Sequence, residues 1–438
     1  RYIEAEIAVT RAEIAYWQGT SESDLKSALT LPYKVATENL EVSRKRGDDG
    51  ASATKPEALE DAHAMLVPVM DEIAKLPTIH DRALVWTALE GYRSFLYLEV
   101  SRRTDACKLA EVQHGSGAPR LTALGIAPLP PDVIQSNVIQ DEGPIVEAIR
   151  RLVQQTGAKA TRVITAVPGP AVMVKKVVLP TQTGAGIEAA VLAEAGHLIP
   201  DSLDNVNLDF QVIDSIEDGS KMEVLVVAVK KDIINRYTDA LRAADLDPVL
   251  VDVDYFALEN MYELNYDPPE GKPVALVNVG ARFSSINILK DGRSTFTGDV
   301  PVGGAEYGDA LARQLGCTPQ QAEVLKLGGS VAGFEASAAA GVLGSVTEFI
   351  CDEIQRALTF FWTAATDESL SGVFLSGGTA RMPDLTQQLQ QRLGCPVEIA
   401  DPFRRLATGG SVDRRTIDDA GPALAVTVGL ATRRPGDK

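Results

Sequence analysis

Three glycine-containing segments of this sequence could bring backbone N–H groups close to a phosphate or a nucleoside. The first is Gly280-Ala281, which follows the hydrophobic run 274–279. A glycine leaves the N–H groups of a turn accessible to a phosphate, because no side chain stands in the way. An ordinary β-turn would explain the same residues, so this pair alone does not establish a site.

The second segment is Gly303-Gly304, directly before a predicted helix that begins at Ala305. The first N–H groups of a helix have no partner within the helix, and the helix dipole places positive charge at that end. We therefore expect unpaired N–H groups here that suit a phosphate. A merely flexible loop is the alternative explanation.

The third segment is Gly377-Gly378-Thr379, which follows the predicted strand 373–376 and precedes the predicted helix 383–393. Two residues without Cβ atoms would let the flat face of an adenosine lie against the backbone. A single Gly-Gly pair is a weak signal. The order of the three segments along the chain is more specific.

Two charged residues accompany these glycines on another predicted helix. Thr318 and Gln321 form a capping box around Pro319, so a helix is expected to begin there. Glu323 and Lys326 are three residues apart on it and therefore share one face. They could bind a ribose or a base edge, or they could form a surface ion pair.

From residue 95 onward, strands and helices are predicted to alternate, which would position these segments. Asp218-Gly219 and Asp291-Gly292 are predicted hairpin turns, because both supply the positive φ angles that tight turns require. A three-strand unit that begins near Phe95 is echoed by a second one from Val274. The predicted strands and helices before residue 274 are 95–100, 108–113, 121–127, 143–156 (helix), 162–167, 172–179, 187–195 (helix), 208–213, 223–229 and 232–244 (helix). Those after it are strands 284–289 and 294–300 and helices 305–315 and 346–363.

Residues 1–94 differ from the rest, because their apolar residues follow helical spacing. We interpret them as a helical segment that packs on the main body or on a partner. The sequence indicates no chemistry for it.

The composition excludes several classes of function. The net charge of −18 argues against nucleic acid or anionic lipid as a direct partner. No stretch reaches the roughly 18 consecutive apolar residues of a spanning helix, so we expect a cytoplasmic protein whose membrane association depends on a partner. The four cysteines have no metal-ligand or CxxC spacing, and we expect reduced, mostly buried thiols.

From about Phe95 to Arg434 the sequence resembles the type IV pilus assembly family PilM and, more distantly, the cell-division protein FtsA, within the actin and sugar-kinase superfamily. The segments that carry the resemblance are 278–281, Gly303-Gly304 with 322–326, 353–358, 376–383, 401–403 and 425–431.

The resemblance implies an α/β fold of the actin-like (ribonuclease H-like) class, with duplicated domains and a small inserted subdomain. It divides the chain after the helical segment 1–94 into a first actin-like part (95–165), the small subdomain (166–232) and the remaining actin-like subdomains (233–434).

The resemblance also implies a cofactor, ATP or ADP with or without Mg²⁺. In the family pattern Gly280 and Ala281 would lie at the second phosphate loop, with Gly303 and Gly304 nearby. Glu323 and Lys326 would lie beside the adenosine, and Gly377, Gly378 and Thr379 would form the adenosine loop. The implied partners are the cytoplasmic tail of a PilN-like inner-membrane protein, received between the small subdomain and its neighbour, and components of the pilus motor.

Two positions depart from the family pattern. The first phosphate loop of the family reads Asp-x-Gly followed by a lysine, whereas here Glu99-Val100-Ser101 precedes Lys108 at a longer distance. Without the glycine the backbone cannot approach a phosphate as closely, so Arg102 or Arg103 would have to compensate. Asn278 replaces an aspartate, and a neutral amide cannot act as a base. Fast hydrolysis is therefore not expected.

Three functions remain open at this point. The chain could be an adaptor that binds nucleotide statically, a scaffold that has lost nucleotide binding, or an active ATPase or kinase of the same superfamily. The sequence favours the first, with no catalytic residue assigned and at most slow hydrolysis.

Overall fold

The structure is a computed structural model that describes residues 95–101, 106–114, 118–130, 133–135, 138–364, 369–410 and 412–433. These residues belong to one compact unit, Ser94–Arg433. The predicted helical segment 1–94 and the two arginines of the first predicted phosphate turn lie outside the described residues.

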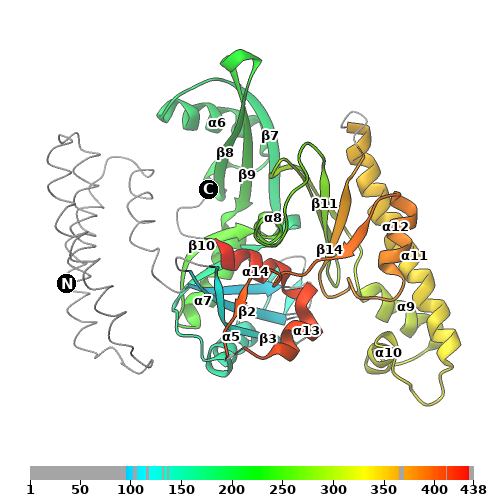
Figure 1. Cartoon of the computed structure of the whole chain (residues 1–438). Helices are drawn as coiled ribbons and strands as arrows, with labels where there is room; N and C mark the ends of the chain where they lie inside the picture. The colour runs from blue at the N-terminus through cyan, green and yellow to red at the C-terminus, as the bar shows by residue number, and fades with distance from the viewer. Residues whose placement is uncertain are drawn as a thin grey trace, which may run out of the picture. The chain divides into compact units, whose positions relative to one another are not determined.

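The first sheet has six strands in the order β10-β6-β1-β2-β3-β16 (Figure 1). Strands β1, β2 and β3 form an antiparallel meander, and β6 and β10 continue the sheet in parallel to β1. Helices α5 and α7 pack on one face through a core that includes Leu109, Ile149 and Leu241. The bounds are β1 Phe95–Ser101, β2 Ala106–Gln113, β3 Arg120–Pro128, α5 Gly143–Thr156, β6 Arg162–Val167, α7 Lys231–Ala243, β10 Asp247–Val253 and β16 Ala407–Thr408.

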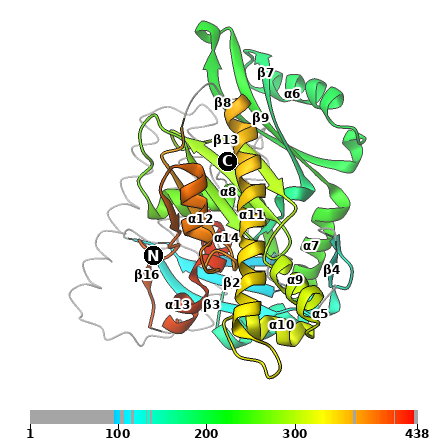
Figure 2. The same ribbon diagram turned by 90° about the vertical axis from the view of Figure 1, so that its right-hand side faces the viewer.

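The second sheet has five strands in the order β13-β12-β11-β14-β15. Again a meander of three antiparallel strands comes first, and two strands parallel to β11 follow. Helices α9, α10, α11 and α12 cover the face whose core includes Val277, Tyr307 and Ile354, and α11 crosses the view of Figure 2 from end to end. The bounds are β11 Val274–Val279, β12 Ser284–Lys290, β13 Arg293–Val300, α9 Ala305–Leu315, α10 Pro319–Lys326, α11 Ala336–Ala364, β14 Gly372–Ser376, α12 Leu385–Leu393 and β15 Val397–Ile399.

The two sheets repeat one topology, which confirms the internal echo predicted from the sequence. In the first meander, Ser101 pairs with Ala106 at the end of the hairpin. In the second, Val279 pairs with Ser284. Ser101 and Ala106 are therefore the counterparts of Val279 and Ser284.

A small three-stranded sheet, in the order β7-β9-β8, lies between β6 and α7 in the sequence. Helix α6 covers one face, where Val191 packs against Val177 and Val224 (Figure 1). The turn between β8 and β9 contains positive φ angles at Asp218 and Gly219, as predicted. The bounds are β7 Val172–Pro180, α6 Ala185–Leu198, β8 Val206–Ile216 and β9 Lys221–Lys230.

Helices α8 (Asp254–Asn265) and α14 (Ala425–Thr432) occupy the space between the two large sheets (Figure 1). They cross at very short range, because a Cβ atom added to Gly429 would stand 1.6 Å from the carbonyl oxygen of Ala257. Side chains of both large sheets, among them Ala110 and Leu276, complete this core. The short elements are β4 Ile134–Gln135, β5 Val138–Ile139, η1 Gly169–Ala171, η2 Leu203–Asn205, η3 Glu217–Gly219, α13 Arg414–Ala420 and η4 Gly421–Leu424.

Most predicted elements are present in the structure, and the differences are missed elements and two misplaced helix starts. The prediction missed β10, α8, β15, α13 and α14, and the short strands β4, β5 and β16. It began α11 ten residues late, because the first ten residues of that helix are mostly alanine, glycine and serine, with Val342 and Leu343 as the larger apolar residues among them. It began α12 at Pro383, whereas Asp384 has a φ of 62° that breaks the helical path, so the helix begins at Leu385. The predicted bounds of α5, β6 and α9 are those of the structure.

Two further predictions concern the whole described part of the chain. All four cysteines are buried and free, as predicted. Among the described residues, no helix is both long and apolar enough to cross a membrane.

Candidate functional site

The three glycine segments meet beyond the carboxyl ends of the parallel strands β11 and β14. Such an edge is where α/β sheets commonly bind ligands. The carbonyl oxygen of Gly280 accepts hydrogen bonds from Gly304 N, at 2.8 Å, and from Thr379 Oγ1, at 3.0 Å. The N–H of Thr379 donates to the carbonyl of Val279 at 3.2 Å. The structure therefore brings Gly280, Gly304 and Thr379 into direct contact.

The N-terminus of α9 does not offer the unpaired N–H groups that the sequence predicted. Gly304 N donates to Gly280 O, and Ala305 N donates to Ala281 O at 2.7 Å. A Cβ atom on Gly303 would stand 2.5 Å from Gly280 O, so the glycine is needed for this backbone approach. The prediction of free amides at Gly304 and Ala305 is wrong, because the turn after β11 uses them. A binding role for the two glycines stays a prediction.

The loop after β14 is held in a conformation that requires glycine. Gly377 has a φ of 91°, and a Cβ atom there would stand 2.3 Å from Val279 O. Its N–H donates to the carbonyl of Pro422 at 2.8 Å, which fixes the loop to η4. Arg381 strengthens this attachment, because its Nη1 donates to Asp419 O at 2.9 Å. Gly378, by contrast, is exposed.

Four polar residues form a row across the second sheet beside these loops. Asn278 pairs with Ser285 on β12 and with Ser376 on β14. Ser285 pairs in turn with Asp299 on β13. Directly paired residues point to the same face of a sheet, so these side chains lie together. We call Asp299, Ser285, Asn278 and Ser376 the polar row.

The polar row faces the first half of the fold. Leu276 lies two residues before Asn278 on β11 and packs in the core with α8 and α14, so Asn278 shares that face. Asn278, Ser285 and Ser376 are buried. Ser376 Oγ donates to Asn278 Oδ1 at 3.3 Å. The hydroxyl of Ser285 has no hydrogen-bond partner among the described residues.

Tyr255, in the first turn of α8, connects the polar row to the first half. Its hydroxyl donates to Asp299 Oδ2. The ring of Tyr255 packs directly against the backbone of Gly169, because a Cβ atom added to Gly169 would stand 2.2 Å from the ring. The neighbouring Asp254 Oδ1 accepts a hydrogen bond from Gly169 N at 2.9 Å. Two consecutive residues of α8 thus fix the loop after β6.

Lys108, the lysine of the first predicted phosphate loop, lies in β2. It is buried and pairs with Ile126, which packs against the same core as Ala110. Lys108 therefore lies on the face of the first sheet that is turned toward α8 and α14. Glu99 pairs directly with Lys108, and Ser101 with Ala106. Backbone pairing extends β1 through Ser101, one residue beyond the predicted strand 95–100, and a phosphate-binding role of Glu99-Val100-Ser101 stays a prediction.

Glu323 and Lys326 are paired with each other. Lys326 Nζ lies 2.7 Å from Glu323 Oε2 on α10, as expected for residues three apart. Thr318 and Gln321 form the predicted capping box at the start of this helix. The surface ion pair considered from the sequence is present, and a contact to adenosine stays a prediction.

An ionisable group that the sequence analysis missed lies on α8. Burial raises the pKa of Glu259 to about 8, the neighbouring Glu263 raises the pKa further, and a hydrogen bond with Asn287 opposes the shift. Glu259 is therefore largely protonated at neutral pH. The sequence held no signal for it, because α8 itself was not predicted.

Two groups of this site are compatible with a nucleotide and Mg²⁺. Gly378 is exposed and has no side chain, whereas a Cβ atom on the neighbouring Gly377 would collide with the backbone of Val279. The buried Ser285 hydroxyl is an unused polar group on the face turned toward the first half. Buried polar groups without a partner are rare in proteins and commonly mark an ion, a water or a ligand.

Comparison with solved structures shows the fold. A chain of a PilM-PilN type IV pilus biogenesis complex matches with a TM-score of 0.69 and 24% identity, covering 78% of this chain and 98% of that one. The ethanolamine utilization protein EutJ from Carboxydothermus hydrogenoformans matches with a TM-score of 0.47 and 16% identity, over 78% and 89% of the two chains. MreB 5 of Spiroplasma citri, bound to AMPPNP, matches with a TM-score of 0.41 and 12% identity, over 77% and 94%.

The family follows from the sequence match together with this fold. The family model described as type IV pilus assembly protein PilM matches residues 100–435, which is most of the chain. The repeated sheets and the small inserted sheet have the actin-like fold. The chain belongs to the PilM family of type IV pilus assembly proteins.

Proposed function

We propose that this chain is a cytoplasmic, inner-membrane-associated adaptor of a type IV pilus assembly system. It binds ATP or ADP statically and docks the cytoplasmic tail of a PilN-like membrane protein, and through that contact it connects components of the pilus motor to the envelope. The observation that carries the assignment is the family match over residues 100–435, together with the likeness to a chain from a PilM-PilN complex.

The glycine loops support nucleotide binding in the second half. The turn after β11 and the loop after β14 are fixed to each other through Gly280 and Thr379, so a ligand would meet a preformed backbone surface. Preformed surfaces bind with a smaller entropic cost than flexible ones. Asn278 is a neutral amide and cannot act as a general base, which supports static binding rather than rapid hydrolysis.

Thermal melting with and without ATP and Mg²⁺ tests nucleotide binding. A ligand at a hundred times its dissociation constant stabilises the folded state by about 2.7 kcal/mol. We expect a clear upward shift of Tm. No shift at millimolar nucleotide would favour a nucleotide-free scaffold. Release of phosphate at the common enzyme rate of about 10 per second would instead make the protein an active ATPase.

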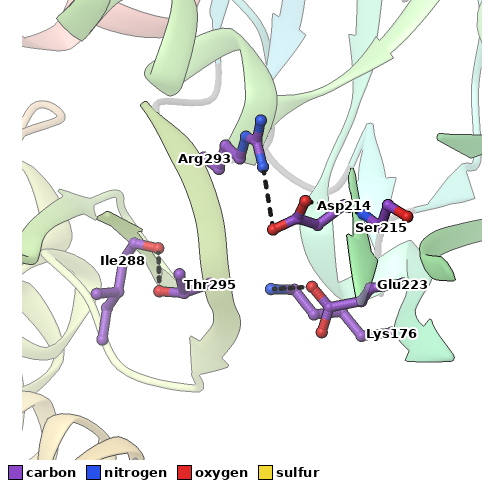
Figure 3. Close-up of polar contacts among 7 residues, drawn as sticks. All are labelled: Lys176, Asp214, Ser215, Glu223, Ile288, Arg293 and Thr295. Atoms are coloured by element: carbon purple, nitrogen blue, oxygen red, sulfur yellow. Dashed lines mark hydrogen bonds and ion pairs between the residues drawn. The ribbon is translucent and has the colours of Figure 1, made fainter. Parts of the chain in front are cut away.

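The open face of the small sheet, opposite α6, is our candidate for the docking of the tail. Figure 3 shows Lys176 beside Glu223, and Asp214 directed toward Arg293 at the start of β13. Val178 shares this face, because it pairs with Glu223, and its side chain is 52% exposed. An exposed apolar side chain between charged residues suits an extended peptide with apolar and charged positions.

Binding of a synthetic PilN-like tail peptide to two variants tests this placement. Val178→Asp puts a carboxylate on the open face and is expected to weaken binding at least tenfold, or about 1.4 kcal/mol. Leu192→Asp is the matched control, because Leu192 is 42% exposed on α6, which covers the opposite face. Equal affinity of the Val178 variant and the wild type would place the tail elsewhere.

A further inference from the structure

The buried hydroxyl of Ser285 lies in the middle of the polar row without a partner. The side chain is fully buried, and Oγ makes no hydrogen bond to any described residue. Such a group loses its hydration on folding and gains nothing in return. Ser285 is therefore poorly explained by folding alone, and its position beside the ends of β11 and β14 points to a ligand.

The two neighbours of Ser285 in the polar row, Asn278 and Asp299, differ in charge and in the hydrogen bonds that their side-chain oxygens already accept. Asn278 Oδ1 already accepts a hydrogen bond from Ser376. Asp299, on the other side of Ser285, is half-buried, and its carboxylate is held by the hydroxyl of Tyr255. Asp299 is the one acid among the four residues of the row. The negative charge of the polar row therefore comes from Asp299 on β13, and not from a residue next to the turn after β11.

A hydrated Mg²⁺ ion matches this combination of groups. Mg²⁺ prefers oxygen ligands, keeps several of its waters, and is commonly held by one or two carboxylates together with the phosphates of a nucleotide. We propose that Asp299 and Ser285 position the Mg²⁺ that accompanies a bound nucleotide. Asp299 supplies the negative charge, and the Ser285 hydroxyl oxygen accepts a hydrogen bond from a water bound to the ion. This inference rests on the nucleotide binding proposed above.

Tyr255 gives the proposal a second consequence. Its hydroxyl and the hydrated ion compete for the same carboxylate, since Tyr255 donates to Asp299 Oδ2. Tyr255→Phe keeps the ring that packs at Gly169 and removes only the competing donor. We expect the variant to bind Mg²⁺ with nucleotide about threefold to tenfold more tightly, while its affinity for nucleotide without Mg²⁺ is unchanged.

The test compares ATP affinity with Mg²⁺ and with EDTA, using the full chain and variants of both residues. Asp299→Asn keeps an acceptor for Tyr255 but removes the charge. It is expected to lower ATP affinity about tenfold with Mg²⁺ and to leave the affinity in EDTA unchanged. Asp309→Asn on α9 is the matched control, because Asp309 is exposed on the same half of the fold. Spin-resonance titration with Mn²⁺ in place of Mg²⁺ counts the bound ions directly.

Ser285→Ala is an independent test, because it should affect the stability of the unliganded protein and the affinity for ATP with Mg²⁺ in opposite directions. Removal of an unpaired buried hydroxyl should leave the Tm of the unliganded protein unchanged or higher. The same variant should lower the affinity for ATP with Mg²⁺ about threefold to tenfold. A purely structural role of Ser285 would instead lower the Tm and leave the Mg²⁺ dependence unchanged.

The outcomes separate this inference from the proposed function. If Asp299→Asn binds ATP as the wild type does in both conditions, the inference is wrong and nucleotide binding stands. If the wild type binds ATP equally with Mg²⁺ and with EDTA, the inference is again wrong. If the wild type binds no nucleotide in either condition, the proposed nucleotide binding fails and this inference fails with it.

Discussion

Asp252, at the end of β10, accepts a hydrogen bond from Nε of Arg433 at 2.7 Å, and the two side chains are 2% and 15% exposed. The contact joins the edge of the first sheet to the end of α14, far apart in the sequence. Asp252 Oδ1 also accepts a hydrogen bond from Val253 N. The nearly buried carboxylate thus depends on Arg433 for the compensation of its charge.

Removal of Arg433 should therefore destabilise the fold. Arg433→Met leaves a buried carboxylate uncompensated, and we expect a loss of about 3 kcal/mol in the free energy of unfolding, measured with urea. In the double variant with Asp252→Asn, the charge is gone and the acceptor for Val253 N remains, so most of the loss should be recovered. A double variant as unstable as Arg433→Met would show that packing, not charge, is responsible.

Gly429→Ala tests the crossing of α8 and α14. The new methyl group would stand 1.6 Å from Ala257 O, so the helices must separate. Overpacking typically costs about 1–3 kcal/mol, and we expect the upper end of this range here because the obstacle is backbone. Gly308→Ala in α9 is the control, because a Cβ there meets nothing within 4 Å. That variant should gain up to about 1 kcal/mol. Similar melting temperatures for the two variants would contradict the described crossing.

The protonation of Glu259 predicts a specific pH dependence. Its pKa is raised to about 8 in the folded protein, from an ordinary value near 4.5 when unfolded. The folded state thus holds the proton more tightly, so the contribution to stability is complete below pH 4.5 and is lost as pH rises through 8. Glu259→Gln should flatten this decline, measured as the free energy of unfolding between pH 5 and 8. An unchanged slope would show that Glu259 is ionised in the folded state.

Gly378→Asp tests the loop after β14 as a nucleoside site. Gly378 is exposed, so the variant should fold with nearly the Tm of the wild type. A carboxylate at this point would meet the ligand, and we expect the ATP-dependent shift of Tm to disappear. Gly394→Asn, at the end of α12, is the control away from the site. Gly394 has a φ of 66°, which asparagine also tolerates, so this variant should fold and keep the ATP-dependent shift. Retention of the full shift by Gly378→Asp would refute the loop assignment.

The sequence predicted the repeated α/β order because the strands and hairpin turns have local signals. Asp291-Gly292, for example, has φ angles of 52° and 70°, which the sequence of the turn already demanded. Helix α8 was missed for a physical reason. Buried residues lie on most sides of the helix, including Tyr255, Leu258 and Asn265, and Glu263 is its one exposed residue, so it shows no clear amphipathic period.

Of the residues in the candidate site, only those in the glycine segments could be named from the sequence. The sequence singled out Gly280, Gly304 and Thr379, which the structure brings into contact, although it assigned the amides before α9 to a ligand rather than to the turn after β11. The polar row could not be foreseen. Ser285 and Asp299 become neighbours only through strand register, which is set by packing across the sheet and not by spacing along the chain.

The carbonyl oxygen of Gly280 has a mechanical consequence. It accepts from both the first turn of α9 and the side chain of Thr379, so one atom joins three segments. A displacement of the loop that contains Thr379 cannot occur without strain at the start of α9. A group that displaced that loop would therefore also disturb the start of α9 through this one oxygen atom.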